Sequence, residues 1–120
     1  MAVTNAADFL GKIATLEIDR PLGSRHPRHG FVYPINYGFV PHTLSPDGAE
    51  LDAYVLGVLG PLTEFTGLCL AVIHRTNDDD DKLIVVPVGH FFTDKEIEAA
   101  TQFQEQFFQS IILRRTTPHE

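Results

Sequence analysis

The chain has 120 residues, of which 43% are hydrophobic, so we expect one domain spanning residues 1–120 with a single packed core. Nine basic and 16 acidic residues give a formal net charge of −7, which argues against a general nucleic-acid or anionic-membrane binder, because both need a basic face. No charged-then-apolar leader opens the chain and no apolar run approaches membrane-spanning length, so a soluble cytoplasmic protein is the default expectation.

Strand-like patterns dominate the first three quarters of the chain. Residues 12–18 alternate from Ala14 onward, with apolar side chains on one face, and predict a half-buried strand. Prolines and glycines indicate a loop over residues 19–32. Four further strands are predicted over residues 37–41, 52–58, 67–75 and 82–88. The single Cys69 lies in an apolar run and cannot form an internal disulfide, so we expect a buried core thiol.

The last third of the chain has a helical period. A threonine and a glutamate at Thr93 and Glu96 form a capping-box signature. Apolar residues then recur at helical spacing, namely Ile97, Ala100, Phe103, Phe107, Phe108 and Ile111. This pattern predicts a long amphipathic C-terminal helix whose aromatic stripe covers either the chain's own barrel or a partner subunit. Five strands followed by one helix predict an α+β, mainly β protein, in the form of a small, mostly antiparallel barrel with a packed helix.

Two acidic turns are the first candidates for a functional site. Asp47, Glu50 and Asp52 lie around a glycine that permits a tight turn, and the run from Asp78 to Asp81 leads into Lys82. Hard cations such as Mg²⁺ take a few carboxylate ligands and share the rest of their shell with water and phosphate. A lysine beside them would act as a point charge on a phosphate oxygen. Both turns could instead be solvated loops, but a carboxylate that begins an apolar strand, as at position 52, needs a partner or a metal.

The only basic cluster lies in the predicted early loop. Arg25 and Arg28 could cradle a phosphate through planar, bidentate contacts, and the alternative is an exposed loop that balances the acidic turns. His26 and His29 do not form a typical zinc pair, because a proline separates them and no cysteine pair accompanies them. Tyr37 is either a core aromatic residue or the donor of a hydrogen bond to an oxyanion.

The segment from Tyr33 to Asp52 resembles the central signature of the soluble, Mg²⁺-dependent inorganic pyrophosphatases of family I. That signature runs Tyr-Pro-x-Asn-Tyr-Gly, then His-Thr-Leu, then Asp-Gly-Asp-Pro-x-Asp. The second acidic turn followed by residues 82–87 is similar to the family's later Asp-x-Lys-Leu-x-x-x-Pro segment, and Phe107-Phe108 is similar to part of its C-terminal helix. The resemblance covers most of residues 12–112. It implies a five-stranded, OB-like barrel with flanking helices, in agreement with the strands predicted above.

The resemblance also implies roles for particular residues. The implied Mg²⁺ ligands are Asp47, Asp52 and Asp80, with a further ligand at Asn77 or Asp78, where the turn is shorter than in the family. The implied phosphate-binding residues are Tyr37, Lys82 and one arginine of the early loop, either Arg25 or Arg28. Tyr37 and Lys82 would act in catalysis by holding the leaving phosphate.

Two departures from the family pattern bear on catalysis. Ala49 stands where the family has an aspartate that helps to generate the attacking hydroxide, and the adjacent Glu50 is the remaining candidate for that role, although its side chain should leave the backbone in another direction. Ile111 and Ile112 stand where the family has a phosphate-binding Tyr-Lys pair. Loss of a positioned base typically costs on the order of 10²–10⁴ in rate, so a slow or retargeted enzyme is physically possible.

The predicted function is therefore Mg²⁺-dependent hydrolysis of inorganic diphosphate to phosphate, weak or retargeted to another phosphoanhydride. The alternative is a non-catalytic module that binds a phosphate-containing ligand on the same fold, which Ala49 and Ile111 favour. A third hypothesis, an OB-like nucleic-acid binder, rests on fold analogy alone and conflicts with the net charge of −7. The expected partner is a small phosphate-containing substrate, with no nucleic acid and no membrane, and a homo-oligomer remains open.

Overall fold

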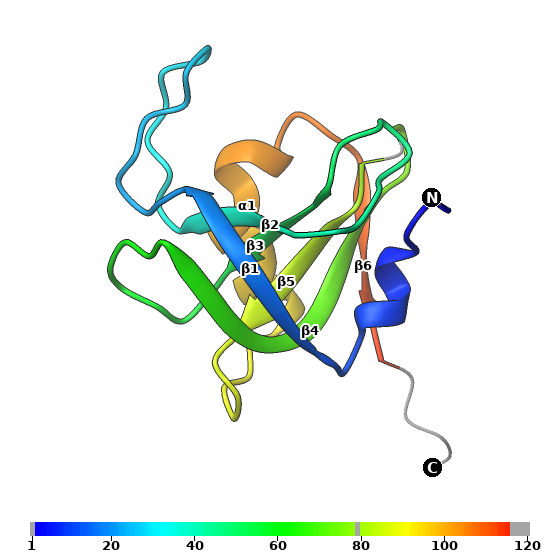
Figure 1. Cartoon of the computed structure of the whole chain (residues 1–120). Coiled ribbons are helices and arrows are strands. Elements are labelled where there is room, and N and C mark those ends of the chain that lie inside the picture. Colours follow the sequence, from blue (N-terminus) through cyan, green and yellow to red (C-terminus); the bar gives the residue numbers. More distant parts are fainter. Residues whose placement is uncertain (1, 79, 116–120) are drawn as a thin grey trace.

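The computed structural model describes residues 2–78 and 80–115 (Figure 1). Its strands are β1 (Ile13–Arg20), β2 (Asn36–Val40), β3 (Leu51–Val55), β4 (Glu64–Arg75), β5 (Lys82–Val86) and β6 (Ser110–Arg114). The described helices are a short 3-10 helix, η1 (Ala6–Phe9), and one α-helix, α1 (Asp94–Glu105). Neither of these helices is long and apolar enough to cross a membrane.

Five of the strands close into a barrel. Around the barrel the order is β1, β2, β3, β5 and β4, and β4 pairs back with β1. The first half of β4 pairs with β1, while its second half pairs with β6. The strand pairs are antiparallel except for β3–β5, which is parallel. The predicted mainly β, five-stranded barrel is therefore confirmed, with one parallel pair inside it and a sixth strand added beside β4.

The hydrophobic core fills the barrel and the space beneath helix α1. Strand β5 is buried along its whole length, and Val55 and Cys69 are buried in one cluster at the barrel centre. The burial of Cys69 agrees with the prediction from its apolar neighbours. A second cluster joins Tyr54 and Ile84 to Ile97 of helix α1. The apolar face of α1 thus covers the chain's own barrel, which was one of the two possibilities predicted for it.

Helix α1 begins where the sequence predicts but ends earlier. The capping box predicted at its first turn is present, with both hydrogen bonds formed. The helix ends at Glu105, so its predicted continuation to Ile111 is wrong, and Phe107 and Phe108 lie in the turn before β6. The reason is a tertiary contact, because residues 110–114 pair with β4 and β-branched residues there suit an extended backbone.

The connection between β1 and β2 forms an arm that projects from the barrel (Figure 1). It is the loop predicted from its prolines and glycines, and an antiparallel bridge between Arg25 and Val32 holds its two sides together. Residues in the turn of this arm, beyond that bridge, line one side of the pocket described below.

Candidate active site

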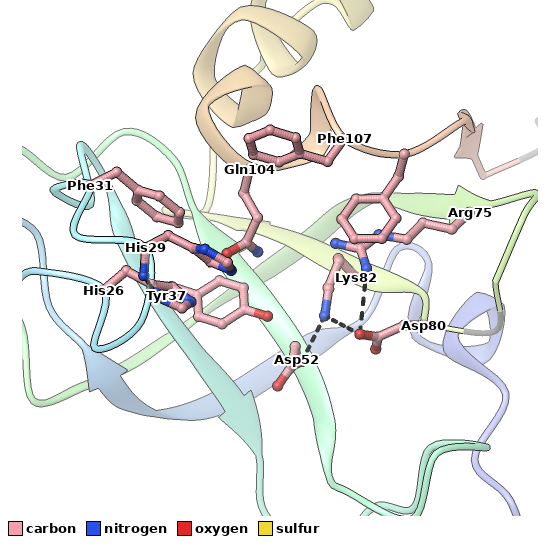
Figure 2. A pocket seen from close by; sticks show the side chains of 11 residues that line it. His26, His29, Phe31, Tyr37, Asp52, Arg75, Asp80, Lys82, Gln104 and Phe107 are labelled. Atoms are coloured by element: carbon pink, nitrogen blue, oxygen red, sulfur yellow. Dashed lines mark hydrogen bonds and ion pairs between the residues drawn. The ribbon is translucent and has the colours of Figure 1, made fainter.

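Two neighbouring parallel strands build the floor of the candidate pocket. Asp52 of β3 lies directly opposite Lys82 of β5 in the register of the sheet. The Lys82 ammonium donates to Asp52 Oδ2 at 2.7 Å and to Asp80 Oδ2 at 2.8 Å (Figure 2). Lys82 is only 2% exposed, whereas the two carboxylate side chains are 28% and 25% exposed. A buried ammonium group is therefore paired with two carboxylates that face the pocket.

Tyr37 of β2 lines the pocket beside this ion pair. The Lys82 ammonium lies 5.6 Å from the centroid of its ring. Burial raises the pKa of the Tyr37 phenol well above its usual range, and the neighbouring Asp52 carboxylate raises it further. The hydroxyl therefore stays protonated at neutral pH and can donate a hydrogen bond to an oxyanion.

A second buried cation, Arg75 at the end of β4, lies next to the acidic turn. Its guanidinium makes a two-pronged contact with Glu105, with Nη2 at 2.8 Å from Oε2 and Nε at 3.1 Å from Oε1. The Phe108 ring packs on the guanidinium, with the guanidinium carbon 3.5 Å from the ring centroid. The remaining nitrogen, Nη1, is 3.5 Å from both Asp78 Oδ2 and Asp80 Oδ2. Arg75 is thus held rigidly on one side and only loosely paired on the side of the acidic turn.

A buried hydrogen-bond chain fixes the end of α1 against the sheet. The Tyr54 hydroxyl donates to Glu105 Oε2 at 2.6 Å, and Gln104 Nε2 donates to the Tyr54 oxygen at 2.7 Å. Glu105 is 7% exposed and receives bonds from both Tyr54 and Arg75, so its charge is fully partnered. This chain sets the position of Arg75 and Gln104 in the pocket.

The pocket has a volume of about 630 Å³. Its charged and polar lining residues are Asp52, Arg75, Asp80, Lys82 and Gln104, and its aromatic lining residues are His26, His29, Phe31, Tyr37, Phe107 and Phe108. Figure 2 shows the charged residues at the base, with the aromatic side chains of the arm to one side of Gln104 and Phe107 to the other. The arrangement can bind an anion at the base and a flat group above it.

The carboxylate pair at the base is suited to Mg²⁺. Mg²⁺ retains several waters and is usually held by one or two carboxylates together with substrate phosphates. Asp52 and Asp80 provide two such carboxylates, whereas the described residues contain no group of three or more His, Cys, Asp or Glu side chains arranged for a metal. Burial raises the pKa of Asp80 despite the lysine and arginine beside it, which indicates that the charge of this carboxylate is not fully compensated.

The structure brings part of the predicted site together. Tyr37, Asp52, Asp80 and Lys82 all line the pocket, and Asp78 lies beside it through its 3.5 Å contact with Arg75. Asp79 of the acidic run lies outside the described residues.

Four other predicted residues do not line this pocket. Asp47 and Glu50 lie on an exposed loop, where Asp47 Oδ1 accepts a hydrogen bond from the backbone of Ala49 at 3.0 Å. Arg25 and Arg28 are exposed on the arm, and the Arg25 guanidinium donates to the carbonyl of its own loop at Gly30. The roles predicted for these four residues remain predictions.

Sequence reasoning missed several residues of the pocket. Arg75, Gln104 and Glu105 were not singled out, because each is an ordinary charged or polar residue at the end of a strand or helix. For Arg75 the available signal was a charged residue close to the end of an apolar run, since a buried charge requires a partner. His26 and His29 were considered only as a zinc pair, whereas they line the pocket as aromatic rings.

Comparisons with known proteins agree on one family. The family model described as inorganic pyrophosphatase matches residues 12–113. The inorganic pyrophosphatase of Saccharolobus solfataricus is 36% identical over 76 residues, which cover 60% of this chain and 41% of that protein. The one from Caulobacter vibrioides is 33% identical over 86 residues, covering 65% of this chain and 49% of that protein. The matched region thus spans less than half the length of these two curated relatives.

Solved structures show the same fold. The inorganic pyrophosphatase of Helicobacter pylori superimposes with a TM-score of 0.67 at 18% identity, covering 96% of this chain and 89% of that one. The one from Ehrlichia chaffeensis gives a TM-score of 0.66 at 19% identity, covering 90% and 86% of the two chains. At these identities the likeness establishes the fold alone.

Proposed function

The chain belongs to the inorganic pyrophosphatase family, and on that premise we propose that it hydrolyses inorganic diphosphate to phosphate in the presence of Mg²⁺. One observation carries the proposal. The buried Lys82 ammonium holds Asp52 and Asp80 at the base of a pocket that also contains Tyr37 and Arg75. Cations and carboxylates gathered in this way suit a phosphate that arrives with a divalent metal.

The residues of this chain would bind and orient the diphosphate. Lys82 and Arg75 provide positive charge, and the protonated Tyr37 hydroxyl provides a hydrogen-bond donor. In the reaction the oxygen of a water bonds to one phosphorus, the bridging oxygen leaves with the other phosphate, and the protons of the water are shared between the two products. Ala49 cannot accept a proton from that water, so Glu50 remains the candidate base, and its loop would have to bring it to the pocket.

The residues proposed to hold Mg²⁺ are Asp52 and Asp80, with Asp78 and Asp47 as further candidates. When bound, Mg²⁺ supplies charge neutralisation and Lewis acidity to the phosphate. The raised pKa of Asp80 supports a cation site, because a carboxylate that burial destabilises gains most from a nearby positive charge. The proposal includes action in the cytoplasm on a small phosphate-containing substrate, with neither nucleic acid nor membrane as a partner.

A second candidate function is a non-catalytic module that binds a phosphate-containing ligand. Ala49 in the exposed loop and Ile111 in place of the family's tyrosine favour it, because both remove groups that the family uses. The two candidates share the pocket and differ in turnover.

The test measures phosphate release from inorganic diphosphate with and without Mg²⁺, using wild type, Asp52→Asn and Asp8→Asn. Asp8 is an exposed aspartate of η1 outside the pocket and serves as the matched control. We expect Mg²⁺-dependent release that falls about 100-fold in Asp52→Asn and is unchanged in Asp8→Asn. Full activity in Asp52→Asn would show that the site is misassigned. Mg²⁺-dependent binding of diphosphate in calorimetry, with no release, would favour the binding module.

A further inference from the structure

Half of the pocket is aromatic, although inorganic diphosphate contains no apolar group. On one side, His26, His29 and Phe31 form a cluster in the turn of the arm, beyond the Arg25–Val32 bridge. The ring centroids of His26 and Phe31 are 4.8 Å apart, and those of His29 and Phe31 are 6.3 Å apart with nearly parallel planes. On the other side, Phe107 and Phe108 follow the end of α1 and line the pocket. The ring faces of Phe31, Phe107 and Phe108 carry partial negative charge, so these three residues do not favour a phosphate anion.

The size of the pocket also exceeds what diphosphate requires. Its volume of about 630 Å³ lies within the roughly 300–1,000 Å³ typical of sites that enclose drug-sized organic ligands. Diphosphate consists of two phosphorus and seven oxygen atoms, and the charged residues occupy only the base of the pocket. The space between the two aromatic groups is therefore available to another part of a larger ligand.

Phe107 is the residue whose environment most needs an explanation. Its side chain is 67% exposed and lies at the pocket, next to Phe108, whose ring is fixed on the Arg75 guanidinium. An exposed aromatic ring beside a charged groove is the arrangement with which proteins stack nucleic-acid bases. Gln104 lies between Phe107 and the arm residues and carries an amide that can form hydrogen bonds to a base edge (Figure 2).

We propose that the phosphoanhydride bound here carries a flat aromatic base, as in a nucleoside diphosphate. The phosphates lie at the bottom of the pocket near Lys82 and Arg75, and the nucleobase stacks on the Phe107 ring. This inference rests on the proposed function, because it uses the same phosphate-binding residues, and it names the substrate class. The reaction is the same hydrolysis: water bonds to the terminal phosphorus, the bridging bond breaks, and phosphate and nucleoside monophosphate leave.

The test compares two ligands that cannot be hydrolysed, so that binding is measured independently of turnover. These are α,β-methylene adenosine diphosphate and methylene diphosphonate, each titrated calorimetrically in the presence of Mg²⁺. The variants are Phe107→Ala and, as the matched control, Phe91→Ala, since both phenylalanines are 67% exposed and only Phe107 lines the pocket.

We expect wild type to bind the nucleoside compound roughly tenfold more tightly than the diphosphonate, which is the size of one base stacking on an aromatic ring. Phe107→Ala should lose most of that preference and leave diphosphonate affinity unchanged, while Phe91→Ala should keep it. Equal affinities for the two ligands would overturn the inference, and so would a Phe107→Ala variant that weakens both ligands alike. A change in sedimentation of Phe107→Ala without a nucleoside-specific loss would also overturn it, because Phe107 would then contact a second copy.

The outcomes separate this inference from the proposed function. Diphosphate hydrolysis together with equal affinities would overturn the inference alone. If the protein prefers the nucleoside compound but does not release phosphate from inorganic diphosphate, the inference is supported, and a nucleoside diphosphate takes the place of inorganic diphosphate as the proposed substrate. Failure of both ligands to bind would overturn the inference together with the binding step of the proposed function.

Discussion

One lysine forms ion pairs with two carboxylates at the base of the pocket. Lys82 contributes one positive charge against the two negative charges of Asp52 and Asp80, so the trio has a net charge of −1 and a cation would improve its balance. Because Lys82 is almost fully buried, its ammonium depends on these two oxygens for the interactions that water would otherwise supply.

Replacement of Lys82 should therefore make stability depend on Mg²⁺. We expect Lys82→Met, which keeps much of the side-chain volume, to lower the free energy of unfolding by about 2 kcal/mol without metal. This loss is smaller than the ~3–5 kcal/mol expected when one partner of a fully buried ion pair is removed, because about a quarter of each carboxylate side chain is exposed to solvent. Millimolar Mg²⁺ should restore part of the loss by taking over the contact with the carboxylates.

Urea unfolding with and without Mg²⁺ measures this effect. The control is Lys95→Met, which removes an exposed lysine of α1 and should change stability little under either condition. A Lys82→Met protein as stable as wild type, or one indifferent to Mg²⁺, would contradict the assignment of this trio as a cation site.

Sequence periodicity gives the position of residues within or beside strands, but it does not give the position of residues on long loops. Asp52 and Lys82 lie in regular strands, whose periodicity and charge place them at the site, and the structure brings them together. Asp47 and Arg25 lie on loops that fold on themselves, through bonds to Ala49 and Gly30, and the sequence contains no measure of where such loops point. Contacts between distant elements, as between Arg75 and Glu105, leave no periodic signal either.

At the level of elements, the close approach of β1 and β2 positions one side of the pocket. β1 carries an irregularity in register between Ile18 and Arg20, opposite Gly38 and Tyr37 of β2. A Cβ atom at Gly38 would collide with the backbone carbonyl of Glu17. Glycine at this position therefore allows β2 to lie against β1 and to direct Tyr37 toward the pocket.

Gly38→Ala should lower the free energy of unfolding by about 3 kcal/mol or more, because the clash involves backbone atoms that cannot rotate away. Equilibrium urea denaturation measures the loss. Gly60→Ala is the matched control, since a Cβ there would meet no heavy atom within 4 Å. Similar stability of the two variants would mean that the strands can separate without cost.

Strands and the start of the helix were predicted well, whereas the end of the helix was not. The capping box and the alternation of residues 12–18 are local signals, and both elements are present. The apolar spacing that predicts helix beyond Glu105 is also compatible with a turn followed by a strand. Pairing with β4 selects the strand over the helix for residues 110–114. Ala71 of β4 pairs with Arg114, and Arg75 pairs with Ser110, so the partner strand lies more than thirty positions earlier in the sequence.

At the level of the whole molecule, β4 holds the barrel together. It pairs with β1, β5 and β6, and Cys69 near its middle is completely buried. Burial raises the pKa of the Cys69 thiol to about 12. At pH 8 the thiol is therefore protonated, and the reactive thiolate is a small minority of the native population.

Cys69 should therefore be unreactive toward a thiol reagent such as dithionitrobenzoate until the barrel opens. Because it is the only cysteine, every modified molecule reports this one position. We expect the labelling rate at pH 8 to rise with urea in parallel with unfolding followed by circular dichroism, and wild type in buffer to label as slowly as it unfolds. Rapid labelling of the native protein would show that β4 opens locally.

Because β3 and β5 are adjacent parallel strands, the geometry of the Asp52–Lys82 ion pair does not depend on the lengths of the surrounding loops. Asp52 and Lys82 face each other because they are register partners in adjacent strands, and neither depends on how many residues connect its strand to the rest of the chain. Insertions or deletions in the acidic turn, or in the loop before β3, can therefore accumulate without disturbing this pair. The ion pair is consequently the part of the pocket most able to persist while the surrounding loops diverge in length.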